Sequence, residues 1–282
     1  MQEPTLDETI LRKWIGKSES ATDILHAQQS RLMQLTLDRE ATLETGDVLP
    51  PVWHWAYFLS GVPMSELGRD GHPALGGFLP PVALPRRMWA GGRLTLEKPV
   101  LLGESITKKS TIKDVMLKQG KSGSLAFVVV RHEYLDQQNE LRFTEEHDIV
   151  YREDPSPDAP KPAPVAPPEN SIYDETITPS TVQLFRYSAL TFNGHRIHYD
   201  RDYCKDVEGY PGLIFHGPLS ATLLADLAQR RIGQDKALKT FSFRAVAPLF
   251  DTAPFTIHHD GGLNIWAQTP EGGLAMKAEV TH

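Results

Sequence analysis

Three features are scarce in this sequence of 282 residues, and each scarcity excludes a class of protein. There is one cysteine, Cys204, so no disulfide can form within the chain, and no spacing supports it as a nucleophile. No apolar run approaches the roughly 18 residues of a membrane span, and the N-terminal MQEPTLDETILRKW lacks the apolar core of a signal peptide. Basic residues do not predominate, because the formal net charge is -7, and this argues against nucleic acid as the main partner. We therefore expect a soluble, cytoplasmic protein that binds neither nucleic acid nor membrane.

Proline is concentrated in one segment. Residues 154–170, DPSPDAPKPAPVAPPEN, contain seven prolines in seventeen positions and almost no large apolar side chain. This composition is typical of an extended, semi-rigid linker. With 40% hydrophobic residues the chain can form a sizeable core, so we expect an N-terminal domain over 1–153 and a C-terminal domain over 171–282.

The two predicted domains show the same order of elements. Each begins with a helix, at Val52 to Ser60 in the first and at Pro218 to Arg231 in the second, and strands follow. Pro99 and Pro248 occupy matching places, 149 residues apart, as an ancestral duplication would leave them. Segments rich in Val, Ile, Phe and Thr predict strands from Gly92 and from Lys239, and at 106–115, 124–135, 143–151, 254–259, 263–269 and 273–281.

One helix and several antiparallel strands per half predict an α+β fold in which a curved sheet wraps around each helix. The two sheets are expected to join edge to edge, which covers edges that otherwise invite aggregation. The first half also contains an insert at 62–93 with no clear period. A loop of that length in a compact domain is usually functional, and Trp89 within it argues against disorder, so we interpret the insert as a lid or wall of a pocket.

The helix from Pro218 has a distinctive start. Apolar residues recur along it at the spacing of one buried stripe, namely Leu219, Leu223, Leu224, Leu227 and Ala228. Gly217 stands where a capping Ser, Thr or Asp is usual, and Pro218 suits the first helical position. The free N–H groups and the helix dipole can therefore stabilise a ligand oxyanion, although water could fill the same role.

The segment before this helix carries a family resemblance. Around it the sequence reads LFRYSALTFNGHRIHYD and then HG at His216 and Gly217. This resembles the D-x-N-P-x-H-x-D and H-G signature of the R-specific enoyl-CoA hydratases, the MaoC-like branch of the hot-dog fold. Asn193 stands at the first Asp position, His195 at the Asn, and His198 at the catalytic His. A sub-branch of mitochondrial hydroxyacyl-thioester dehydratases and bacterial mesaconyl-C4-CoA and itaconyl-CoA hydratases is more similar still, also in GGFLPPVALPRRMWAGGRL and EEHDIVYRE. The resemblance implies a double hot-dog.

The resemblance also implies an activity, the reversible addition of water across the alpha-beta double bond of an acyl thioester. Gly217 N–H would bind the carbonyl oxygen and His198 would be the base, while Asn193 would orient the water. His195 could share or replace the base role. Asp200 reads as the N-cap of a short helix rather than as a second base. No cofactor is implied, and the histidine spacing does not match common zinc motifs, so no metal is expected.

The acyl-CoA substrate is the least determined feature. The resembling bacterial enzymes act on short branched dicarboxylic CoA esters, whose free carboxylate calls for an arginine fork. Candidate contacts for the substrate are Arg86, Arg87, Trp89, Arg186, Tyr187 and His216, although the arginines could equally be surface or phosphate contacts and Tyr187 could simply pack. Two alternatives stay open: a fatty-acid type 3-hydroxyacyl-thioester dehydratase and a non-catalytic acyl-CoA-binding protein. Self-association into a homo-oligomer is expected, as is common in this fold.

Overall fold

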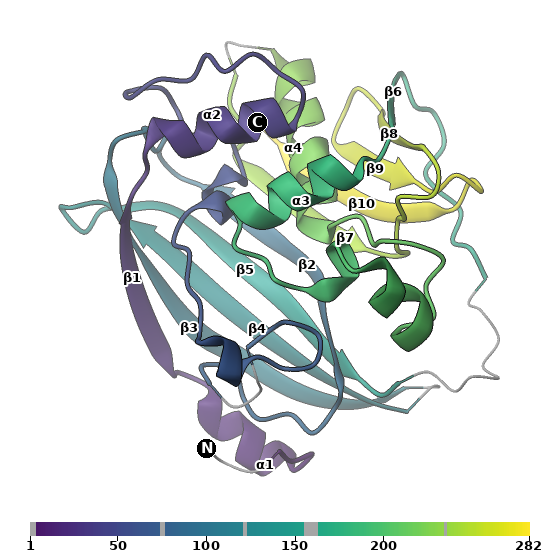
Figure 1. Cartoon of the computed structure of the whole chain (residues 1–282). Coiled ribbons are helices and arrows are strands. Elements are labelled where there is room, and N and C mark those ends of the chain that lie inside the picture. Colours follow the sequence, from purple (N-terminus) through teal and green to yellow (C-terminus); the bar gives the residue numbers. More distant parts are fainter. Residues whose placement is uncertain (1–3, 74–76, 121–122, 155–162, 234–235) are drawn as a thin grey trace.

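The computed structural model describes residues 4–73, 77–120, 123–154, 163–233 and 236–282. Ten strands and a few helices make up the chain (Figure 1). The α-helices are α1 (Glu8–Leu11), α2 (Ala27–Thr36), α3 (Thr181–Leu190) and α4 (Gly217–Ile232). The strands are β1 (Ser18–Ile24), β2 (Arg86–Leu96), β3 (Ser105–Gly120), β4 (Gly123–Leu135), β5 (Leu141–Arg152), β6 (Tyr173–Ile177), β7 (Thr240–Ala245), β8 (Phe255–His259), β9 (Asn264–Gln268) and β10 (Leu274–Thr281).

All ten strands form one antiparallel sheet, in the order β1-β3-β4-β5-β2-β7-β10-β9-β8-β6. The halves of the chain meet where β2 pairs with β7, so the predicted edge-to-edge junction is confirmed. Arg93 pairs there with Ser242, which lies 149 residues further along the sequence. This is the spacing of Pro99 and Pro248, so each half contributes the corresponding strand to the junction and the two strands are related by an approximate two-fold axis.

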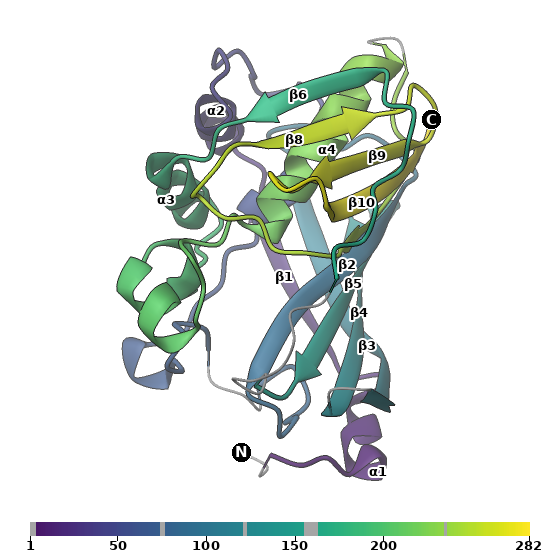
Figure 2. The same cartoon turned by 90° about the vertical axis from the view of Figure 1, so that its right-hand side faces the viewer.

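α4 is the central helix of the C-terminal half, as predicted. It packs against β7, β8, β9 and β10, which curve around it in Figure 2. Every residue of the predicted apolar stripe is buried, from Leu219 to Ala228. Removing these side chains from water supplies the main stabilisation of this half, at roughly 25 cal/mol for each Å² of apolar surface buried.

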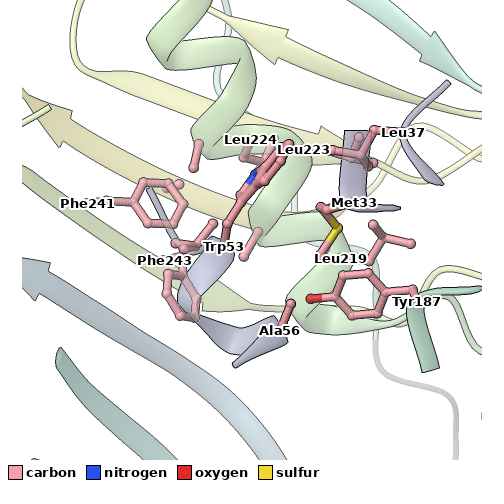
Figure 3. Packing of buried hydrophobic residues seen from close by; sticks show 14 of the residues in the cluster. Met33, Leu37, Trp53, Ala56, Tyr187, Leu219, Leu223, Leu224, Phe241 and Phe243 are labelled. Atoms are coloured by element: carbon pink, nitrogen blue, oxygen red, sulfur yellow. The ribbon is translucent and has the colours of Figure 1, made fainter. Parts of the chain in front are cut away.

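Among the described residues of the N-terminal half no long helix corresponds to α4, and the prediction of a helix from Val52 to Ser60 is wrong. Within Val52 to Ser60 only Trp53–Ala56 are helical, and they form one 3-10 turn. Val52 and Phe58 have positive φ angles of 64° and 54°, and an α-helix cannot pass through such residues. This 3-10 turn nevertheless lies in the main hydrophobic core, together with residues of α4 and β7. In Figure 3 Trp53 lies with Leu223 and Leu224 of α4 and with Phe241 and Phe243 of β7.

Several other elements differ from the sequence-based expectation. The loop within the predicted insert at 62–93 is shorter than expected, because its last residues belong to β2 (Arg86–Leu96), in the middle of the sheet. α1, α2, α3, β1 and β6 were not predicted, and α2 packs on α3 of the other half (Figure 1). Residues 155–162 of the predicted linker lie outside the described residues. Among the described helices, none combines the length and apolarity needed to span a membrane.

Candidate active site

The loop after α3 carries the predicted catalytic residues. α3 ends at Leu190, and Phe192 turns the chain with a φ of 50°. The Asn193 backbone N–H donates to the Ser188 carbonyl at 2.8 Å, and Asn193 Oδ1 accepts from the His195 backbone N–H at 3.0 Å. The carbonyl end of the Asn193 amide is thus used within its own turn. Its NH2 group is the end that remains to bind a ligand, and it can only donate.

The His198 ring is buried and has a fixed protonation state. It is 6% exposed, and its Nδ1 lies 2.8 Å from the carbonyl oxygen of Ile214. Because a carbonyl only accepts, Nδ1 must carry the proton, and Nε2 is left with its lone pair free. Burial lowers the pKa of His198 to about 4, although the bond to Ile214 acts in the opposite direction. The ring is therefore neutral at pH 7 and ready to accept a proton at Nε2.

His216 packs directly beside this base. The two rings stack with centroids 3.7 Å apart, and His216 is completely buried. Its Nε2 lies 2.9 Å from Ser188 Oγ, and Nδ1 has no partner among the described residues. Burial, followed by the charges of His198 and His195, lowers the pKa of His216 well below its usual value. Tyr187 is buried against the same ring, with centroids 5.0 Å apart. His216 and Tyr187 thus form the inner wall behind His198.

The start of α4 lies next to these rings. Gly217 follows His216 and begins the helix, and no side chain caps it. Trp89 of β2 covers this point, because a Cβ built on Gly217 would lie 3.3 Å from Trp89 Cε3. The helix start lacks a side-chain cap, as predicted, but the cap position is His216 and not Gly217, which is the first helical residue. Sequence reasoning also named Trp89, which approaches Gly217 from a strand rather than from a lid.

Trp89 is supported by a buried acidic residue that the sequence did not single out. Glu145 of β5 accepts hydrogen bonds from Trp55 Nε1 at 2.6 Å and Tyr134 Oη at 3.0 Å, and contacts His54 Nε2 at 2.9 Å and His147 Nε2 at 2.7 Å. Burial favours the neutral acid, but the charges and hydrogen bonds of His147 and His54 outweigh it and keep the pKa of Glu145 well below its usual value. Trp55 in turn packs edge-on against Trp89, with centroids 5.4 Å apart.

A second group that the sequence did not reveal packs against the loop that follows α3. The turn at 68–72, within the predicted insert, places His72 against His195 with ring centroids 4.2 Å apart. His195 is 5.5 Å from His198, and burial, then the charges of His72 and His198, lowers its pKa to about 3. The only signal in the sequence was the turn-forming GRDGHP segment, whose partner could not be read from spacing.

The three candidate arginines have different surroundings. Arg86 is paired with Asp154 at 2.7 Å and with Glu208 at 3.2 Å. Arg186 is exposed on α3 and donates to the Leu35 carbonyl at 3.3 Å. Arg87 is half-buried, and no carboxylate pairs with it among the described residues. Its charge is among those that lower the pKa of His195, after burial and the charges of His72 and His198, so Arg87 lies on the side of the catalytic loop.

Other predicted features have simple structural roles. Asp200 Oδ1 accepts from the Tyr203 N–H at 2.9 Å, so it is the helix cap that was predicted. Two groups bring metal-binding side chains within 4.8 Å of one another: Asp70, His72 and His195, and His132, Glu145 and His147. The carboxylate oxygens of both groups already accept hydrogen bonds, so we assign both as hydrogen-bonded networks.

The fold is that of a hot-dog protein, and the candidate site places a buried histidine next to the uncapped start of α4. A MaoC-like dehydratase from Phytophthora capsici has the same fold, with a TM-score of 0.70 and 14% identity over 98% of this chain and 99% of that one. The profile of hydroxyacyl-thioester dehydratase type 2 matches residues 52–251. The chain belongs to this family.

Two curated relatives extend the comparison. Mesaconyl-C(4)-CoA hydratase of Chloroflexus aurantiacus is 44% identical over 95% of this chain and 96% of its own length. The mitochondrial hydroxyacyl-thioester dehydratase type 2 of Schizosaccharomyces pombe is 29% identical over 82% of this chain and 83% of its own length. The double hot-dog expected from the sequence is confirmed, with a 3-10 turn in place of the first central helix.

Proposed function

We propose that this protein is a hydro-lyase that reversibly adds water to mesaconyl-C4-CoA and forms citramalyl-CoA. In the isomeric itaconyl-CoA the double bond is not conjugated with the thioester, so a proton transfer would first have to move it to the alpha-beta position. The similarity to the Chloroflexus hydratase over nearly the whole of both chains is the observation that carries the choice of substrate. The choice of reaction is supported by the site, where the His198 ring, protonated at Nδ1, stacks on His216 at the uncapped start of α4.

The helix terminus and His198 divide the chemistry. The thioester carbonyl accepts the Gly217 N–H, where the helix dipole stabilises the negative charge of an enolate. His198 Nε2 removes a proton from water as the water oxygen bonds to the beta carbon and the double-bond electrons move towards the carbonyl. The proton then passes from Nε2 to the alpha carbon. His198 ends as it began, and dehydration follows the same steps in reverse.

Asn193 and Trp89 position the reacting groups in this proposal. The Asn193 NH2 group donates to the oxygen of the water, which directs a water proton towards His198. Trp89 closes the pocket above Gly217, and the Glu145 network fixes it through Trp55. Exclusion of water by these aromatic side chains strengthens the hydrogen bond at the carbonyl.

Arg87 is the proposed receptor for the free carboxylate of the acyl group. Arg86 is saturated by Asp154 and Glu208, so it is poorly suited to bind a further anion. Arg87 lacks a carboxylate partner among the described residues and acts electrostatically on His195. A substrate carboxylate would supply the counter-ion that this half-buried guanidinium lacks among the described residues.

The test compares Arg87→Met with the matched control Arg186→Met on two substrates. With mesaconyl-C4-CoA, we expect Arg87→Met to lower kcat/KM by about 100-fold, the order of a lost charged hydrogen bond. With crotonyl-CoA, which has no free carboxylate, it should change little, and the control should resemble wild type on both. Equal losses on both substrates would contradict the role of Arg87. A wild type that prefers crotonyl-CoA or longer chains would favour a fatty-acid type dehydratase instead, and binding without turnover would favour an acyl-CoA-binding protein.

Two further expectations belong to this proposal. The enzyme is expected to work in the cytoplasm and to form a homo-oligomer, as the sequence predicted. Neither expectation enters the chemistry above, because every proposed catalytic residue comes from one chain.

A further inference from the structure

The turn at residues 68–72 is fixed to the catalytic loop by its backbone. The Asp70 carbonyl accepts the Arg196 N–H at 2.9 Å, and the Arg69 carbonyl accepts from the Arg196 side chain at 3.2 Å. Gly71 has a φ of 86°, and a Cβ there would lie 2.2 Å from the Gly194 carbonyl oxygen. Only glycine permits this approach. The N-terminal half therefore holds a defined position over residues 194–196, two residues from the base.

The side chains of this turn form an ordered pair directed at His195. Asp70 Oδ1 accepts the His72 backbone N–H at 3.0 Å, and Asp70 Oδ2 lies 3.2 Å from His72 Nδ1. The carboxylate thus receives the Nδ1 proton of His72 and fixes the orientation of the ring. Burial opposes ionisation of Asp70, but the bonds from His72 dominate and lower its pKa. The His72 ring also packs against the His195 ring, with centroids 4.2 Å apart.

We infer that Asp70 and His72 are positioning residues of the active site, which hold the His195 ring beside His198 during the hydration reaction. The inference rests on the proposed function. An isolated Asp-His pair at the surface would contribute little, because solvent screens exposed ion pairs. Here the pair is one-third exposed or less and lies between a fixed turn and a catalytic loop.

The charges around His195 give the pair a measurable consequence. The titratable and charged groups that act on His195 are His72, His198, Asp70 and Arg87. After burial, which is the largest cause, the interaction with His72 lowers the pKa of both His195 and His198. Removing it should raise the pKa of each, so the acid limb of the kcat profile should move to higher pH. If Asp70 and His72 had only a structural role, their replacement would not move the acid limb.

The experiment uses Asp70→Asn and His72→Phe in the full chain. His72→Phe keeps a ring against His195 and removes both nitrogens, while Asp70→Asn keeps the acceptor for the His72 N–H and removes the charge. The matched control is Asp174→Asn, because Asp174 pairs with His258 at 2.7 Å on β6 and β8, outside the site. With mesaconyl-C4-CoA we expect kcat to fall about 10- to 100-fold in the first two variants, as for misplaced catalytic groups, with KM within about twofold.

The pH dependence of kcat distinguishes a positioning role of Asp70 and His72 from a purely structural role. In His72→Phe the acid limb of kcat should lie at higher pH than in wild type, and in the control it should not move. Unchanged kcat and pH profile in both variants would overturn the inference, even if their melting temperatures fell. A wild type inactive on all thioesters would refute the proposed function alone. Nitrogen-15 NMR titration of the His195 and His198 rings would then decide, since an unaltered titration in His72→Phe would overturn the inference.

Discussion

Replacement of His198 by asparagine isolates the proposed base from its structural role. The amide nitrogen of an asparagine occupies nearly the place of His Nδ1, so it can still donate to the Ile214 carbonyl, which accepts from Nδ1 at 2.8 Å in the wild type. Nothing in the variant reaches the place of Nε2. The substitution therefore removes the proton acceptor and keeps the hydrogen bond that anchors the loop.

The expected magnitude follows from the loss of a general base. Such groups contribute about 100- to 10,000-fold in rate, or roughly 3–5 kcal/mol of transition-state stabilisation. Because the proposed substrate contacts at Gly217 and Arg87 are unchanged, the loss should appear in kcat and not in KM. The variant loses the stacking of His198 on His216, whose centroids are 3.7 Å apart, so some thermal stability should also be lost.

The wild-type pH profile supplies an independent check on the same residue. With a pKa of about 4, His198 should be only about 3% protonated at pH 5.5, whereas an ordinary histidine with a pKa near 6.5 would be about nine-tenths protonated. The neutral ring is the base in hydration. Hydration should therefore stay nearly constant from pH 7 to 5.5 and be lost as the pH falls through about 4.

The assay follows the mass of the CoA ester after short incubations with mesaconyl-C4-CoA, for wild type, His198→Asn and His198→Gln. Gln places its amide near the position of Nε2 and loses the Ile214 contact, so it should be both inactive and less stable. If His198→Asn kept kcat within tenfold of wild type, His198 would not be the base. An acid limb near pH 6.5 in the wild type would refute the reasoning from burial.

Two further predictions concern stability. Replacing Glu145 by glutamine turns an amide NH2 towards two of the four groups that contact the carboxylate. We expect this to lower the free energy of unfolding in urea by about 3 kcal/mol. Glu133→Gln, at the surface of β4, is the control, and an equal effect of both substitutions would contradict the network. Acidification should also destabilise the fold, because burial lowers the pKa of His132 to about 3 and of His198 to about 4, below their unfolded value near 6.5. The folded state then binds fewer protons than the unfolded state. Stability is complete above pH 6.5 and falls with pH, by about 2 kcal/mol for each histidine between pH 7 and 5, and a flat denaturation midpoint over that range would argue against it.

The sequence predicted the C-terminal half better than the N-terminal half for a physical reason. α4 is specified locally, by a full apolar stripe and a Gly-Pro start, and both are visible in a single segment. The turn at Trp53–Ala56 is instead fixed by distant contacts, since Trp55 and His54 bind Glu145 of β5. Local propensity favoured a longer helix there, and tertiary contacts replaced it with one turn.

The same distinction applies to the site. His198, Asn193 and Gly217 were found because one short stretch of sequence carries them all. The contact of His72 with His195 joins two loops from different halves of the chain, and no spacing could reveal it. The candidate carboxylate receptor was narrowed to Arg87 only when the ion pairs of Arg86 were seen.

The pairing of β2 with β7 separates two kinds of evolutionary constraint. The proposed proton transfer and oxyanion binding belong to the half that contains α4, while Arg87 and Trp89, the proposed contacts of the acyl group, lie on β2 across the junction. Substitutions in β2 can therefore change which acyl group is accepted while the groups that move protons stay in place. After duplication of an ancestral domain, one copy could retain its chemistry while the other acquired new substrates, and the shared sheet kept the two in register.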